Sequence, residues 1–117
     1  MAEHRGYKYS AVDGIITLAD LVSGARGDTI LVGRDIRKVS VGVTVAAIGV
    51  NVVVRLEGTI DNTNWFNLDS TGIDITITVD GTYLLVTEDA DILLGVAPYW
   101  VSTNGGAPTI TALARVR

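Results

Sequence analysis

The chain has 117 residues, no cysteine, one histidine and a formal net charge of −4 at pH 7. This length suits a single domain with a real hydrophobic core. The lack of cysteine excludes disulfides and thiolate metal sites. The negative charge argues against nucleic-acid binding, which depends on clustered lysine and arginine.

Hydrophobic residues make up 48% of the chain and charged residues only 19%. Either the sheets pack unusually well or part of the apolar surface is covered by partner proteins, and the second interpretation is favoured. The N-terminal MAEHRGYKYS is polar and lacks the apolar segment of a signal peptide. No apolar run reaches the roughly 18 residues of a membrane-spanning helix, so no membrane association is predicted.

Residues 1–11 are predicted to form an extended N-terminal arm, followed by one β-sandwich domain over residues 12–117. The arm combines basic side chains with tyrosines, which provide contact area at low entropic cost. It either frays, as chain ends often do, or docks on a neighbouring molecule. In the second case the partner-binding residues are Arg5, Tyr7, Lys8 and Tyr9.

The next segments are short. Residues 14–22 are compatible with one helical turn, but the β-branched Ile15, Ile16 and Thr17 favour a strand. A glycine-rich loop over 23–28 contains Arg26-Gly27-Asp28, an integrin-binding tripeptide that also arises readily by chance. A short strand is predicted over 29–32.

Two segments with strict alternation follow, and alternation indicates half-buried strands. They are joined by a predicted turn of small residues over 46–49. The residues expected to face the core are Val39, Val41, Val43 and Val45 in the first segment, and Val50, Val52, Val54, Leu56 and Ile60 in the second. Arg55, Glu57 and Thr59 are expected on the opposite face.

A hairpin is predicted to close at Asp61-Asn62-Thr63-Asn64, because Asx side chains bond their own backbone and tolerate left-handed conformations. Trp65 begins the return strand. It either caps the fold or presents its ring to a sugar, and the first interpretation is favoured. Asp61, Asn64 and Trp65 are thus the turn and core residues of this signature hairpin.

The clearest strand by alternation covers Ile73 to Val79, and Asp80-Gly81 is a strong hairpin signal leading to a return strand over 82–87. The acidic turn 88–91 is interpreted as a solvated loop, with calcium binding as the alternative.

Residues 92–102 are predicted to form a strand on which Trp100 shares the core face of Ile92, Leu94 and Val96. A turn at 104–106 then leads to a last strand over 108–116.

About eight short strands with turn signals roughly every ten residues predict an all-β protein, either an antiparallel β-sandwich or a jelly-roll-like barrel.

Catalytic chemistry is not expected. The only histidine, His4, lies in the arm, and the serines have no visible base nearby. No enzyme activity and no cofactor are predicted.

The segment Leu56-Glu57-Gly58-Thr59-Ile60-Asp61-Asn62-Thr63-Asn64-Trp65 resembles a pattern in small β-rich structural proteins of tailed bacteriophages, including capsid decoration (cement) proteins. Three later motifs match the same layout, so the resemblance covers residues 36–116: Asp80-Gly81-Thr82-Tyr83, the strand from Ile92 to Val101 with Asn104-Gly105-Gly106 after it, and Thr109-Ile110-Thr111. Carbohydrate-binding sandwiches of the discoidin type carry a related turn, with serine and glycine where this chain has Thr59 and Asn62.

The phage resemblance implies a protein without catalytic residues on the surface of a virion capsid. It would bind the major capsid protein at junctions between capsomers, commonly as a homotrimer, and staple neighbouring subunits. The second resemblance leaves a carbohydrate-binding or receptor-adhesion module as the alternative function.

Overall fold

The computed structural model describes residues 7–8, 15–32, 36–68, 74–88 and 90–117. Within these ranges the protein is all-β with no α-helix, which confirms the predicted fold class. Its elements are β1 (Tyr7–Lys8), β2 (Ile15–Leu18), β3 (Ala25–Arg26), β4 (Thr29–Leu31), β5 (Val39–Thr59), β6 (Trp65–Asn67), β7 (Ile75–Ile77), β8 (Gly81–Thr87), a 3₁₀ turn (Ala90–Ile92) and β9 (Gly95–Val116).

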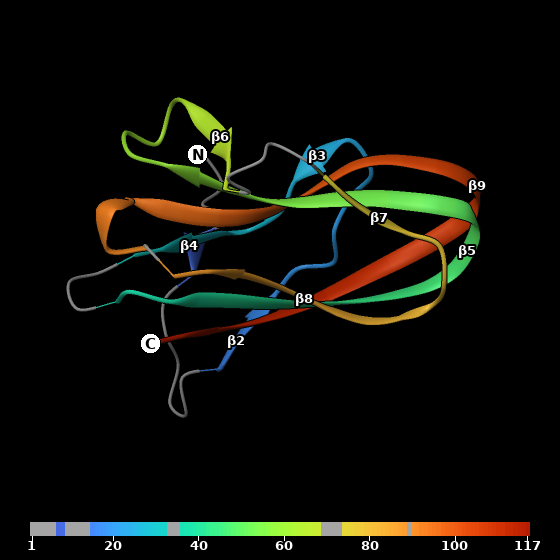
Figure 1. Ribbon diagram of the computed structural model, residues 1–117, viewed down its shortest axis with the longest axis horizontal. Helices are drawn as coiled ribbons and strands as arrows, with labels where there is room; N and C mark the ends of the chain where they lie inside the picture. Colours follow the sequence, from blue (N-terminus) through green and yellow to red (C-terminus); the bar gives the residue numbers. More distant parts are fainter. Residues whose placement is uncertain (1–6, 9–14, 33–35, 69–73, 89) are drawn as a thin grey trace, which may run out of the picture.

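Two long strands organise the fold. β5 and β9 pair antiparallel along almost their whole length, from Val39 opposite Val116 to Thr59 opposite Gly95. Both strands bend near their middle, at the right-hand end of Figure 1, so that each contributes to two facing layers. The β-sandwich is therefore one curled sheet.

The two halves of each long strand pair with different short strands. In the first layer, residues 39–45 of β5 pair with β8, and residues 112–115 of β9 pair with β2. In the second layer, the later half of β5 pairs with β6 and β7, and the early half of β9 pairs with β3 and β4. The two-residue β1 adds parallel to β4 at the margin.

The bend replaces two predicted turns. The sequence predicts hairpin turns at 46–49 and 104–106, but β5 and β9 continue through both places with irregular register. Ala47 has φ 62°, and Gly105 and Gly106 have φ 74° and 69°. A Cβ on Gly49 would lie 2.3 Å from the carbonyl carbon of Gly105, so the two backbones touch here only because this position lacks a side chain.

The predicted hairpin at Asp80-Gly81 is also corrected. β7 and β8 do not pair with each other, since each pairs with a different half of β5. Asp80 instead lies beside the bend, where its carboxylate accepts hydrogen bonds from the backbone N–H groups of Ala47 (3.1 Å) and Ile48 (3.0 Å). Asp80, which the sequence predicts in a hairpin turn, therefore stabilises the bend of β5 instead.

The core lies between the layers and follows the predicted alternation where the strands are regular. The four valines at 39, 41, 43 and 45 are buried, as are Val52, Val54 and Leu56. Trp100 is buried as predicted, next to Val96 on the same face of β9. These residues form one continuous hydrophobic cluster with side chains from β2, β4, β7 and β8.

The alternation fails in the bend and where strands end. Val50 is exposed because it lies in the bend, and Ile60 is exposed because it follows the last residue of β5. Ile92 and Leu94 are exposed because β9 begins only at Gly95.

The strand predicted over 73–79 shortens to β7, with Ile77 buried. Ile75 and Val79, which the alternation also assigned to the core face, are exposed, and Ile73 lies outside the described residues.

Candidate interaction surfaces

The outer face of the first layer is unusually apolar for a solvent-facing sheet. Because inward valines alternate with outward residues, this face collects the small and aliphatic positions of β2, β5, β8 and β9. We call it the Thr/Leu face; its members are Ile15, Thr17, Ser40, Gly42, Thr44, Thr82, Leu84, Val86, Thr111 and Leu113. Among the outward positions of β2, β8, residues 39–45 of β5 and residues 110–116 of β9, all of which the structure describes, Arg115 is the one charged residue.

Gly42 makes the centre of the Thr/Leu face concave. Leu84 of β8 and Leu113 of β9 lie opposite Gly42 on its two sides, and they are 66% and 53% exposed. A hollow of about 420 Å³ opens here, bordered by threonines, by Leu113 and by Asp20, which follows the end of β2. The Thr44 and Thr82 hydroxyls bond each other at 2.9 Å across its floor. The face thus offers aliphatic area and short hydroxyl groups around a shallow depression, with the Asp20 carboxylate at its border.

A charged and aromatic cluster covers the outer face of the second layer. The carboxylate of Glu57 is buried and accepts hydrogen bonds from Nε of Arg26 and from Nε of Arg55, both at 2.9 Å. The Arg26 guanidinium lies 4.1 Å from the ring centroid of Trp65, and that of Arg55 lies 5.0 Å from the ring centroid of Tyr99. These contacts join β3, β5, β6 and β9, so the cluster acts as a structural clamp.

Trp65 is half-buried beneath this clamp. Its strand pairs with the end of β5, with Trp65 opposite Thr59, which agrees with the predicted role in capping the hairpin. One face of its ring is occupied by Arg26, so stacking on a sugar would have to use the other face.

The signature turn is built as the sequence predicts. Asp61 accepts hydrogen bonds from the backbone N–H groups of Thr63 (2.9 Å) and Asn64 (2.8 Å), and from the Asn64 side-chain amide (2.7 Å). Asn62 takes the left-handed conformation, with φ 62°. The backbone N–H of Asn64, followed by that of Thr63, holds the pKa of Asp61 far below its ordinary value.

Thr59 completes the turn from the inside. Its hydroxyl donates to the Asn64 carbonyl at 2.7 Å and accepts from the Asn62 N–H at 2.9 Å. Thr59 and Glu57 do point away from the core, as predicted, yet both are buried because the turn and Arg26 cover them.

The arm is described only at Tyr7 and Lys8, whose backbone lies parallel to β4. Arg5 and Tyr9 lie outside the described residues, so the partner-binding role of the arm stays a prediction.

The Arg26-Gly27-Asp28 tripeptide is engaged within the fold. Arg26 is ion-paired to Glu57, and Asp28 is buried, with its carboxylate accepting a 2.8 Å hydrogen bond from the Ala19 N–H. This arrangement does not present an integrin-type loop.

The described ranges contain no gathering of three or more His, Cys, Asp or Glu side chains that could hold a metal. In the acidic turn, Asp89 lies outside those ranges. No helix of the described chain is long and apolar enough to cross a membrane.

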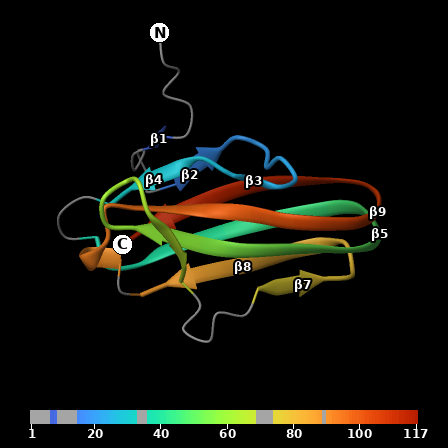
Figure 2. The same ribbon diagram turned by 90° about the horizontal axis from the view of Figure 1, so that it is seen from above.

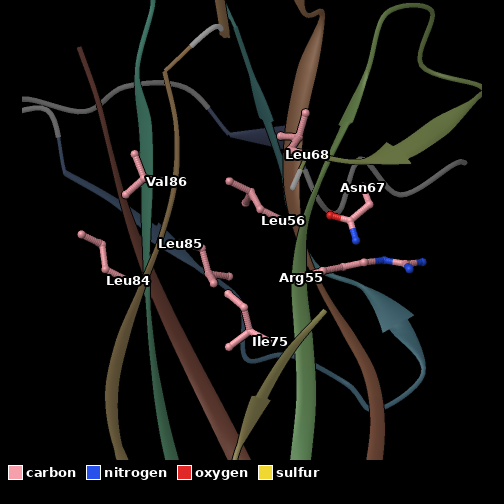
Figure 3. Close-up of a pocket in the computed structure, with 8 residues that line it drawn as sticks. All are labelled: Arg55, Leu56, Asn67, Leu68, Ile75, Leu84, Leu85 and Val86. Atoms are coloured by element: carbon pink, nitrogen blue, oxygen red, sulfur yellow. The ribbon is translucent and has the colours of Figure 1, made fainter. Parts of the chain in front are cut away.

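A third feature is a cleft at the open margin of the sandwich, between β8 of the first layer and β6 and β7 of the second. It has a volume of about 300 Å³, and Leu56, Ile75 and Leu85 point towards one another inside it (Figure 3). Leu68 also lines it, whereas the Arg55 side chain points away. We call it the edge cleft.

Sequence reasoning alone could find part of the Thr/Leu face, but it could not find the charged clamp. Arg26 and Glu57 are 31 positions apart, and no local pattern connects them. The Thr/Leu face is visible as the outward half of each alternating strand, but its assembly depends on strand order.

Fold and surfaces together define an all-β protein whose prominent exposed feature is an apolar sheet face. No protein-family model matches the sequence, and no curated protein matches it either. Among solved structures, the fold is similar to that of the SPBc2 prophage-derived protein YomS, with a TM-score of 0.57 and 16% sequence identity. The likeness covers 88% of this chain and 91% of YomS, so the two share a fold over nearly their full lengths.

Proposed function

We propose that this protein is a non-enzymatic structural protein of a phage particle. Two independent lines support the proposal: the fold is shared with a prophage-derived protein, and the segment 36–116 resembles small phage structural proteins. The described surfaces suit binding better than chemistry, since their polar groups are hydroxyls and ion-paired side chains.

Within that class, we propose that it decorates the outside of the capsid and staples neighbouring major capsid subunits. The observation that carries this proposal is the Thr/Leu face, an apolar sheet face with one charged residue among its outward strand positions. Monomeric soluble proteins rarely expose large continuous apolar patches, so such a face indicates a protein partner.

The energetics fit a lattice partner. Full burial of an aliphatic side chain contributes about 1.5–3 kcal/mol, and Ile15, Leu84, Val86 and Leu113 are 41–66% exposed, so each would gain only part of that amount. After the cost of association, such a contact is modest for one copy. Repetition over a capsid, with each copy touching two subunits, raises the effective affinity by avidity.

Immunogold labelling of purified particles tests the location. Antibodies against this protein are expected to label the heads of particles from the phage or prophage that encodes it. Label confined to the tail, or absence of the protein from purified particles, would overturn the decoration function. Binding to a glycan array by a protein that ignores capsids would favour the carbohydrate-binding alternative.

The docking face is tested by Leu113→Lys, which places a charge in the Thr/Leu face on an inner strand. This variant is expected to fold normally, because Leu113 is 53% exposed, and to lose capsid co-sedimentation. Val50→Lys is the matched control, since Val50 is equally exposed (56%) but lies in the bend. If both variants lose capsid co-sedimentation equally, or if neither variant loses it, the assignment of this face is contradicted.

A further inference from the structure

β8 is an edge strand of the first layer. It pairs with β5 on one side, and no described residue pairs with its other side. In Figure 2, β8 lies at the margin of its layer, beyond β5. An unpaired edge exposes a row of backbone N–H and C=O groups that can accept a further strand.

Within the part of the chain that the structure describes, this edge lacks the usual protection against pairing. The seven residues GTYLLVT contain no charge and no proline, and the register with β5 runs from Val45–Gly81 to Val39–Thr87 without a bulge. Natural proteins normally guard such edges with lysine, proline, bulges or a covering loop. A charge-free strand of high β propensity is instead suited to pairing with an identical strand.

The edge cleft lies directly beneath this edge. All three of Leu84, Leu85 and Val86 border the cleft, but in Figure 3 Leu85 points into it while Leu84 and Val86 point to the other side of β8. A strand added to β8 would alternate in the same way, placing every second side chain over the cleft. Ile75, which is 38% exposed at the mouth, would then be covered.

We propose that a second copy of this chain occupies the edge, with β8 of the two copies paired antiparallel about a two-fold axis at Leu85. Leu84 of each copy then faces Val86 of the other on the outer side, and the first layers form one continuous sheet. The identical uncharged strands make this contact self-complementary.

Charge selects the register. Pairing centred on Leu84 would place Asp80 of one copy opposite Glu88 of the other at both ends, and like charges directly opposite are destabilising. Moving the centre to Leu85 shifts the strands by two residues, so every side chain keeps its face. Glu88 then lies opposite the neutral Thr82.

The expected dimer is weak. Seven residues span about 24 Å, and a sandwich edge with its side chains is roughly 15 Å deep, which gives about 700 Å² in total for both copies. Stable complexes bury roughly 1,200–2,000 Å². The contact is therefore expected to form at high protein concentration or on a lattice. It does not depend on the capsid function proposed above.

Sedimentation equilibrium from micromolar to millimolar concentration tests the dimer. The unmodified chain and Leu113→Lys are expected to share one monomer–dimer constant, whereas Leu84→Lys should dimerise at least about tenfold more weakly. Leu84 and Leu113 are matched, because both lie opposite Gly42 and both are exposed. A monomer at all concentrations, a trimer, or equal effects of the two lysines would overturn the proposal.

Cysteine cross-linking tests the register, and the chain offers a cysteine-free background. The double variant Leu84→Cys/Val86→Cys is expected to form a covalent dimer on mild oxidation, because opposed residues on antiparallel strands lie within disulfide range. Thr111→Cys/Leu113→Cys has the same spacing on the same face of an inner strand and should remain monomeric. Equal cross-linking of both pairs would refute edge pairing. If the protein dimerises through β8 but immunogold labelling does not find it on capsids, only the decoration function is contradicted.

Discussion

Buried Glu57 shows how single side chains determine this fold. It receives Arg26 from β3 and Arg55 from its own strand, one on each carboxylate oxygen. Both arginines also lie over aromatic rings, which adds cation–π attraction to the two ion pairs. The clamp fixes a two-residue strand that has little hydrogen bonding of its own.

Asp61 gives a prediction about pH. Its folded pKa is lowered by N–H donors, so the folded state binds fewer protons than the unfolded chain. Its stabilising contribution is fully present above the unfolded pKa of about 3.9 and is lost as the pH falls below that value. Asp61→Asn keeps an acceptor oxygen but no charge. The stability difference between the two proteins, measured by urea unfolding, should be constant near neutral pH and shrink below about pH 4. A difference that does not change with pH would refute this origin.

At the scale of the elements, the bend is the decisive feature. Gly49→Ala would place Cβ 2.3 Å from the Gly105 carbonyl carbon and 2.4 Å from the Gly106 nitrogen. Because all the nearest atoms are backbone, the strands must separate, and we expect a loss of about 1–3 kcal/mol in the free energy of unfolding. Chemical denaturation measures this loss.

Gly42→Ala is the matched control on the same strand. A Cβ there meets only the Leu113 carbonyl oxygen, at 3.9 Å. Alanine should therefore be neutral or stabilising by up to about 1 kcal/mol, because glycine is entropically unfavourable in a strand. If Gly49→Ala behaves like Gly42→Ala, the close backbone contact is not required for the bend.

The same element explains what sequence could and could not predict. The valines at 39–45 reveal their strand because period-two alternation follows directly from strand geometry. Small residues and glycines at 46–49 and 104–106 indicate a change of direction, but a hairpin turn and a bend of two paired strands use the same residue types. Only the pairing of β5 with β9, which places Ile48 opposite the distant Gly106, distinguishes them. The Thr/Leu face and the clamp depend on that pairing in the same way.

At the scale of the whole molecule, the outer faces of the two layers differ. The second layer is covered on its outside by the charged clamp and the signature turn, whereas the first leaves the Thr/Leu face and the β8 edge exposed. One curled sheet thus combines a closed side, which stabilises it, with an open side available for assembly.

The N-terminal arm provides the last prediction. Only Tyr7 and Lys8 are described as pairing, and they pair with the marginal strand β4. Deleting residues 1–11 should therefore leave the sandwich folded, with a nearly unchanged thermal transition by circular dichroism, because the described core cluster is built from side chains between Ile16 and Val116. Capsid occupancy should fall if Arg5, Tyr7, Lys8 and Tyr9 contact a neighbouring subunit, since two tyrosines supply large area at low entropic cost. Tyr7→Ala/Tyr9→Ala, which keeps the arm and its charges, separates the aromatic contribution from the basic one. Unchanged occupancy after the deletion would leave the Thr/Leu face as the attachment surface and exclude the arm.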